Sequence, residues 1–196
     1  DITSGFMGSG ITRFFSRRGK NAHVVLRDGV IYRGGEAVLD ASEILIPGVH
    51  NVENYMAAIA MVEGLVEDDT IRHVAKTFGG VEHRIELVRI KDGVKFYNDS
   101  IASSPSRTIA GLRSFKEKVI LIAGGYDKHI PYDVLGPEIC AHVKQVFLCG
   151  ATAPQIRAAV ENCADFQGQV AMTDCGNFEN AVRTAAAAAK EEAKKR

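Results

Sequence analysis

Hydrophobic positions along the chain follow two periods, one typical of strands and one typical of helices. Near the start, AHVVLRDGVIYRGG places an Asp-Gly turn at Asp28 between two apolar runs, which predicts a hairpin. EILIPG (43–48) predicts a further short strand. In HNVENYMAAIAMVEGL the apolar residues recur at helical spacing and Asn51 could cap the start. DDTIRHVAKTF predicts a second helix, capped by Asp68 or Asp69.

The pattern restarts after two glycines at 79–80. IELVRIKDGVKFYN predicts a strand, an Asp-Gly turn and a strand, and the strands KVILIAGG, KQVFLCG and GQVAM then alternate with helices. These helices are expected from about residue 106, near 134–142, over 154–162 and from 177. Such alternation predicts an α/β fold whose mostly parallel sheet is covered on both faces. We place a domain boundary near 79–83, which gives domains 1–82 and 83–196.

Composition excludes several classes of function. The 24 basic and 24 acidic side chains cancel, so we expect no nucleic-acid partner. The four cysteines show neither CxxC spacing nor nearby histidine pairs, which predicts reduced, mostly buried thiols and no metal site. No apolar run approaches the roughly 20 residues of a membrane span. We therefore expect a cytoplasmic protein that binds no membrane. We also expect a monomer.

Polar clusters lie at the junctions between the predicted elements: HNVEN (50–54), EHR (82–84), NDS (98–100) and GGYDK (124–128). Asn51 and Asn54 share one helical face, so their amides could meet one planar ring. Arg84 offers a fork of donors that suits phosphate, and Lys128 offers a point charge for an anion. Each cluster alone is also typical of a helix cap, a turn or a solvated side chain.

The stretch NDSIASSPSRT (98–108) follows a predicted strand and precedes a predicted helix. Carboxyl ends of parallel strands form the crevice in which open α/β sheets bind their ligands. The same residue types are common in any strand-to-helix turn, so this loop also has two interpretations.

The order of these motifs carries a resemblance to a known family. HNVEN, GGVEHR, NDS and LIAGGYDK together resemble the Mur ligases of peptidoglycan synthesis, and GGYDK resembles the branch that adds D-glutamate. The resemblance runs from about Phe14 to about Lys190. It implies that 1–82 is the C-terminal part of a P-loop-type α/β ATP-binding domain. It also implies that 83–196 is a Rossmann-like amino-acid-binding domain, truncated at its C-terminus.

The resemblance implies an ATP-dependent, amide-forming ligase. ATP would phosphorylate the carboxylate of UDP-MurNAc-L-Ala, and the amine of D-glutamate would attack the acyl phosphate. Mg²⁺ would be a second cofactor, with its ligands largely in an upstream part. Because no GxxxxGK[ST] phosphate-binding loop occurs here, we expect this chain by itself to be inactive.

The resemblance also implies roles for single residues. The nucleotide would be bound by His50, Asn51, Asn54, Arg84 and Asp99. Arg84 would meet the phosphates and Asp99 the ribose hydroxyls. Ser103 and Lys128 would bind a carboxylate of D-glutamate, and Arg84 and Lys128 would be the catalytic residues.

One loop departs from the family pattern. The usual loop reads NDSKATNP, whereas here Ile101 replaces the lysine, Ser103 the threonine and Ser104 the asparagine. Ser103 keeps a hydroxyl, but Ile101 cannot supply positive charge near the phosphates. Two alternatives stay open: a sister Mur ligase that adds another amino acid, and a non-catalytic nucleotide-binding Rossmann-like module. The missing third glycine of GxGxxG weakens the second alternative.

Overall fold

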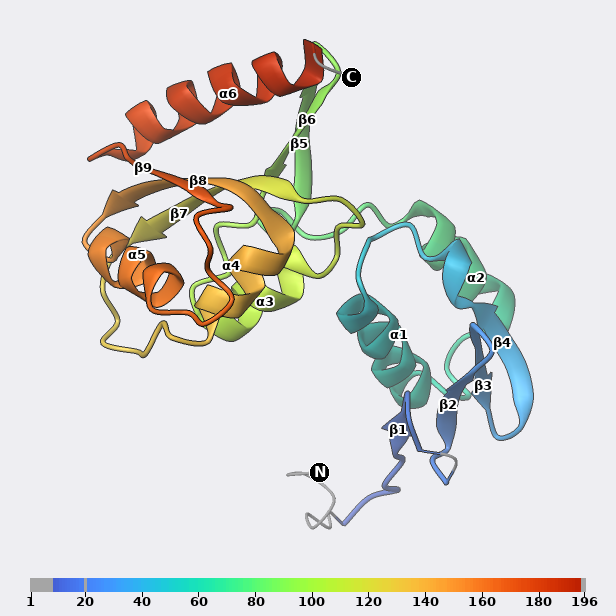
Figure 1. Cartoon of the computed structure of the whole chain (residues 1–196). Coiled ribbons are helices and arrows are strands. Elements are labelled where there is room, and N and C mark those ends of the chain that lie inside the picture. The colour runs from blue at the N-terminus through green and yellow to red at the C-terminus, as the bar shows by residue number, and fades with distance from the viewer. Residues whose placement is uncertain (1–8, 20, 195–196) are drawn as a thin grey trace. The chain divides into compact units, whose positions relative to one another are not determined.

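The computed structural model describes residues 9–19 and 21–194, and the chain forms two compact units (Figure 1). The first unit extends to Gly79 and the second begins at Gly80. Each unit has its own sheet and its own buried core, so each is described by itself.

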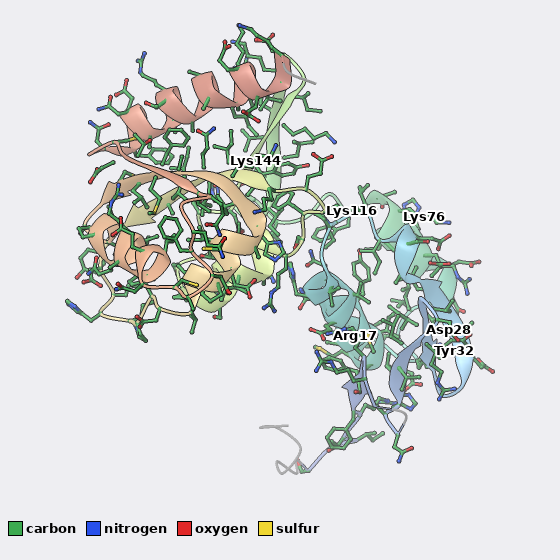
Figure 2. The ribbon with its side chains drawn as sticks, viewed as in Figure 1. Arg17, Asp28, Tyr32, Lys76, Lys116 and Lys144 are labelled. Carbon is green, nitrogen blue, oxygen red and sulfur yellow. The ribbon has the colours of Figure 1, made fainter. Side chains whose placement is uncertain are left out.

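The first unit contains a four-stranded sheet in the order β1-β2-β3-β4. Its strands are β1 (Phe15–Ser16), β2 (Val24–Arg27), β3 (Val30–Arg33) and β4 (Glu36–Asp40). β1 pairs parallel with β2, and the other pairs are antiparallel. Asp28, labelled in Figure 2, has φ 47° and Gly29 has φ 82°, the left-handed pair that closes a two-residue hairpin. The predicted hairpin is thereby confirmed.

Two α-helices, α1 (Val49–Met61) and α2 (Asp68–Thr77), complete this unit together with the short 3-10 helix η1 (Ala41–Glu43). Apolar residues at helical spacing on both helices pack on the apolar face of the sheet, which removes hydrocarbon surface from water. The buried cluster consists of Val24, Ile31, Val38, Leu39, Tyr55, Met56, Ile59, Ala60, Ile71 and Ala75.

Three predictions for this unit were wrong. EILIPG is not a strand: the fourth strand is Glu36–Asp40, and Ile44 and Ile46 pack on the core from irregular backbone. The cap of α1 is Gly48, whose φ of 103° suits glycine, and Asn51 lies inside the helix. The cap of α2 is Glu67, so Asp68 and Asp69 occupy the first turn of this helix. Their negative charges there interact favourably with the helix dipole.

The second unit contains a hairpin and a separate parallel sheet. The hairpin strands are β5 (Glu86–Lys91) and β6 (Val94–Asn98), and the sheet has the order β7-β8-β9. Its strands are β7 (Val119–Gly125), β8 (Val143–Gly150) and β9 (Ala171–Asp174), and the helices are α3 (Pro105–Leu112), α4 (Leu135–His142), α5 (Ala153–Glu161) and α6 (Phe178–Lys194). The last strand begins three residues after the predicted segment GQVAM does.

Helices cover both faces of the parallel sheet, as Figure 1 shows with α6 on one side and α3, α4 and α5 on the other. The central strand β8 alternates between the two layers. Val146 and Leu148 join the core formed with α3, α4 and α5, whereas Phe147 and Cys149 pack with helix α6. The prediction of a parallel sheet with helices on both faces is confirmed for these three strands, of which the central strand β8 is the buried one.

The backbones of β7 and β8 approach closely at their carboxyl ends. A methyl group added at Gly124 would lie 1.7 Å from the carbonyl oxygen of Cys149, whereas one at Gly125 would meet nothing within 4 Å. The two glycines have φ values of 136° and 139°, so both need the same unusual backbone conformation.

We expect Gly124→Ala to lower the free energy of unfolding of the second unit by about 2 kcal/mol more than Gly125→Ala does. Both substitutions strain the backbone similarly, and only the first adds an overlap with main-chain atoms. Urea denaturation followed by circular dichroism would measure the difference. If both variants lost the same free energy of unfolding, β7 and β8 would be able to move apart at this point without an energetic cost.

Candidate functional site

The loop after β7 presents one lysine and fixes the aspartate next to it. Asp127 accepts hydrogen bonds from the backbone N–H of His129 at 2.7 Å and from Nε2 of Gln155 in α5 at 2.9 Å. Lys128 is exposed, and its ammonium makes no hydrogen bond or ion pair within the described part of the chain. The fold therefore leaves a cation available at the carboxyl end of a parallel strand.

Arg84 lies on a tight turn just before β5. Its neighbours His83 and Ile85 have φ values of 64° and 48°, in the left-handed region. The backbone N–H of Ile85 donates to Oδ1 of Asp99 at 3.1 Å, and that of His83 donates to Oε2 of Glu86 at 2.8 Å. The Arg84 side chain is exposed and contacts no acceptor among residues 9–19 and 21–194. The turn thus presents a guanidinium to solvent.

The loop after β6 lies beside this turn. The backbone N–H of Ile101 donates to the carbonyl of His83 at 3.2 Å, so the structure brings Arg84 and Asp99 into one local arrangement. Ser103 is exposed, two residues before α3 begins at Pro105. Ile101 is 47% exposed, so it places an apolar side chain where the family pattern has a lysine.

The first two turns of α1 carry the three predicted residues of the first unit. Asn51 is 7% exposed, and its Nδ2 donates to the carbonyl of Pro47 at 2.6 Å. Asn54 donates from Nδ2 to Oδ1 of Asn51 at 3.2 Å and is itself exposed. His50 is half-buried. The two amides do lie together, but Asn51 is engaged with protein and Asn54 is the one that faces outward.

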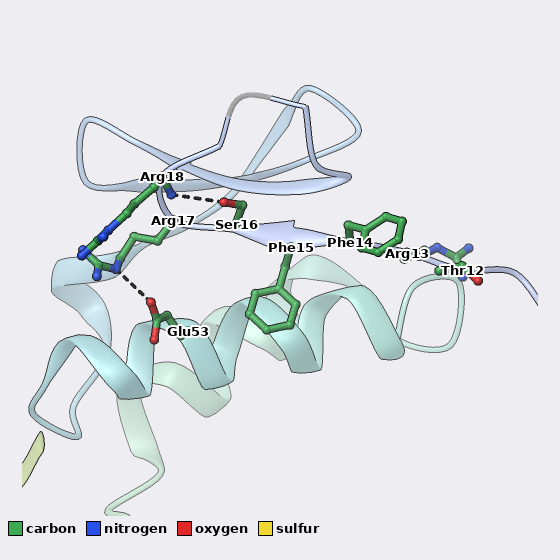
Figure 3. Close-up of a pocket in the computed structure, with 8 residues that line it drawn as sticks. All are labelled: Thr12, Arg13, Phe14, Phe15, Ser16, Arg17, Arg18 and Glu53. Atoms are coloured by element: carbon green, nitrogen blue, oxygen red, sulfur yellow. Dashed lines mark hydrogen bonds and ion pairs between the residues drawn. The ribbon is translucent and has the colours of Figure 1, made fainter. Parts of the chain in front are cut away.

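Two hollows in the first unit were not anticipated from the sequence. One, of about 510 Å³, is lined by Thr12–Arg18 and Glu53, and Figure 3 shows Arg17 reaching Oε1 of Glu53, 3.0 Å from its Nε. The other, of about 600 Å³, lies by Arg33 and residues 64–69. Neither contains a predicted site residue. The arginines of TRFFSRR are the sequence signal that could have pointed to the first.

The cysteines are core residues. Cys140 and Cys149 are buried, Cys163 and Cys175 are partly buried, and all four are free thiols. Burial raises the pKa of the Cys140 and Cys149 thiols, so both stay protonated at neutral pH.

Neither a metal site nor a membrane span is found within the described residues. No three His, Cys, Asp or Glu side chains there are grouped closely enough to hold a metal ion. No helix over 9–19 and 21–194 is long and apolar enough to cross a bilayer.

Comparison with known families identifies the second unit. A family model described as "Mur ligase, glutamate ligase domain" matches residues 83–194, which is more than half of the chain. The chain belongs to the Mur ligase family. The resemblance carried by the four polar motifs is therefore confirmed at the level of the family.

Curated Mur ligases match nearly the whole length of this chain. The UDP-N-acetylmuramoylalanine--D-glutamate ligase of Acetivibrio thermocellus is 52% identical over 195 residues, covering 94% of this chain and 42% of the relative. The enzyme of the same name from Ruminiclostridium cellulolyticum is 44% identical over 200 residues, covering 92% of this chain and 43% of the relative. The chain thus spans about two fifths of the length of these Mur ligases.

A more distant likeness exists among solved structures. Folylpolyglutamate synthase of Mycobacterium tuberculosis, complexed with ADP and AMPPCP, superimposes with a TM-score of 0.61 at 17% identity. The match covers 89% of this chain and 43% of that protein. At 17% identity this likeness shows a shared fold between this chain and the synthase, and nothing about function.

We expect the two amides of α1 to differ in what they contribute to stability. Asn51→Ala should lower the free energy of unfolding of the first unit by about 1 to 3 kcal/mol, because the carbonyl of Pro47 loses its donor. Asn54→Ala should change it by no more than about 0.5 kcal/mol, since its side chain is exposed. Thermal denaturation of both variants would test this, and similar losses would contradict it.

Proposed function

We propose that this chain is part of an ATP-dependent ligase that adds D-glutamate to UDP-MurNAc-L-Ala through an acyl phosphate. The observation that carries the proposal is the 52% identity to a D-glutamate ligase over 94% of this chain. The similar enzymes of Clostridium beijerinckii and Clostridium perfringens carry the same name, which favours D-glutamate over the amino acids of sister ligases.

The two exposed cations support this reaction chemically. Acyl-phosphate chemistry depends on positioning and on neutralising charge around the transferring group. Arg84 would donate its planar fork to phosphate oxygens. Lys128 would pair with a carboxylate of D-glutamate and so orient the attacking amine, and the hydroxyl of Ser103 would donate to the same carboxylate.

The residues present fit the nucleotide in part. Asn54 faces outward on α1 and would offer its amide to the adenine, whereas Asn51 would act by holding Asn54 in place. His50 lies one residue before Asn51 and would border the ring. Asp99 already accepts one hydrogen bond through Oδ1, so a ribose hydroxyl would have to share this carboxylate.

The fit to Mg²⁺ is different. The described side chains form no group of three metal ligands, so no step is assigned to Mg²⁺ on this chain. The metal and the phosphate-binding loop would be supplied by the remainder of a complete ligase. In that ligase, 1–82 would be the C-terminal part of the ATP-binding domain, and 83–196 would be the Rossmann-like domain for the amino acid. The location would be the cytoplasm.

The first experiment addresses Lys128. In the complete ligase, Lys128→Ala should weaken D-glutamate binding by about 1.5 to 3 kcal/mol, the scale of a hydrogen bond to a charged group. The Michaelis constant for ATP should move far less, and Lys128→Arg should restore only part of the loss. Steady-state kinetics with D-glutamate and ATP varied separately would measure both.

A matched control is Lys116→Ala, which removes another exposed lysine of the same unit (Figure 2). It should leave both constants unchanged. If Lys128→Ala behaved like this control, Lys128 would not be part of the site.

The second experiment addresses the chain by itself. Without the phosphate-binding loop it should release no phosphate in the presence of ATP, UDP-MurNAc-L-Ala and D-glutamate. A coupled phosphate assay would test this, with the complete ligase as the positive control. Phosphate release that required all three substrates would show that the ATP site needs no further segment.

A further inference from the structure

The turn that presents Arg84 is strained on both sides. His83 and Ile85 both have left-handed φ values, and for a β-branched residue such as Ile85 this conformation is a genuine outlier. A strained backbone persists only where its surroundings hold it. The turn must therefore be held by contacts outside itself.

One such contact comes from Asp99. Its Oδ1 accepts the backbone N–H of Ile85 at 3.1 Å, across 14 residues of sequence. Ile85 is 8% exposed, so this N–H would otherwise be a shielded donor without a partner. A carboxylate is a stronger acceptor than a neutral oxygen, which suits it to hold an unfavourable backbone conformation.

Helix α3 leaves room for this carboxylate at one position. A methyl group added at Gly111 would lie 2.7 Å from Oδ2 of Asp99 and 4.0 Å from Cδ1 of Ile85. Gly111 is helical and its φ is not positive, so its backbone does not require glycine. An alanine there would instead force the Asp99 carboxylate to move.

We propose that Gly111, Asp99 and Ile85 form a chain of contacts that positions Arg84 for its ligand. Asp99 is then a positioning residue that acts through Arg84, and Gly111 keeps it in place. That the ligand at Arg84 is a phosphate rests on the proposed function. The chain of contacts itself rests only on the geometry of the second unit.

The contact chain can be tested directly on the 196-residue protein labelled with ¹⁵N-isoleucine. Gly111→Ala and Asp99→Ala should both shift the Ile85 amide upfield and speed its hydrogen exchange, because the bond to Oδ1 is lost. Asp99→Asn should largely preserve both signals, since an amide oxygen can replace Oδ1 as the acceptor. Gly10→Ala, which adds the same methyl group in open space, is the matched control.

An Ile85 amide that is unchanged in Gly111→Ala would overturn the proposal. If that variant fails to fold, the comparison of Asp99→Ala with Asp99→Asn decides the question. Equal exchange of the Ile85 amide in those two variants and in the unmodified protein would equally overturn it.

Ligand binding separates positioning from direct contact. In the complete ligase, Gly111→Ala should weaken ATP binding about tenfold or more beyond its effect on adenosine binding. Arg84 would act on the phosphates, which only ATP carries, whereas a ribose contact of Asp99 would be common to both ligands. The double variant with Arg84→Ala should bind ATP more weakly than Arg84→Ala alone only by the factor that Gly111→Ala costs adenosine, since both changes remove the same interaction with the phosphates. Isothermal titration calorimetry would measure all four proteins.

The remaining outcomes are distinct. Fully additive losses of ATP binding would contradict positioning through Arg84, and equal losses for ATP and adenosine would show that Gly111→Ala acts only through the ribose end of the ligand. If Arg84→Ala leaves ATP binding unchanged, the phosphate role in the proposed function fails, while the Ile85 amide still decides whether the contact chain exists.

Discussion

The close approach of the β7 and β8 backbones at their carboxyl ends governs the arrangement of the second unit. At position 124, only a residue without a side chain fits beside the carbonyl of Cys149. At the same end, the N–H of Thr152 at the start of α5 donates to the carbonyl of Gly125. The loop that carries Lys128 therefore leaves the sheet beside α5, where Asp127 can reach Gln155.

Short and long polar side chains have different tasks in this protein. The short side chains form hydrogen bonds within the protein and so help to hold the loops. Asn51 donates to a backbone carbonyl, and Asp99 and Asp127 accept from backbone N–H groups. Arg84 and Lys128 extend into solvent from the turns so held. This division is physically reasonable because a short side chain reaches only its own neighbourhood, whereas a long cation can reach a ligand without giving up its hydration beforehand.

Sequence patterns predicted the elements well where periodicity was strong. The Asp-Gly turns at Asp28 and Asp92, the three parallel strands and the helix over Val49–Met61 all formed near the predicted positions. The failures were at short apolar runs and at caps. Ile44 and Ile46 pack against the core, partly buried, without joining a sheet, and a run of this length cannot reveal whether a partner strand will exist.

The sequence by itself determined the α/β alternation, the family and the types of side chain available for chemistry, because periodicity, glycine turns and motif order are local properties of the chain. Tertiary structure alone decided the use of each side chain. Asn51 became an internal hydrogen-bond partner, and Asp99 came to hold the N–H of Ile85, a residue 14 positions away. Such pairings depend on which loops the packed helices and strands bring together, and no local pattern in the sequence specifies that.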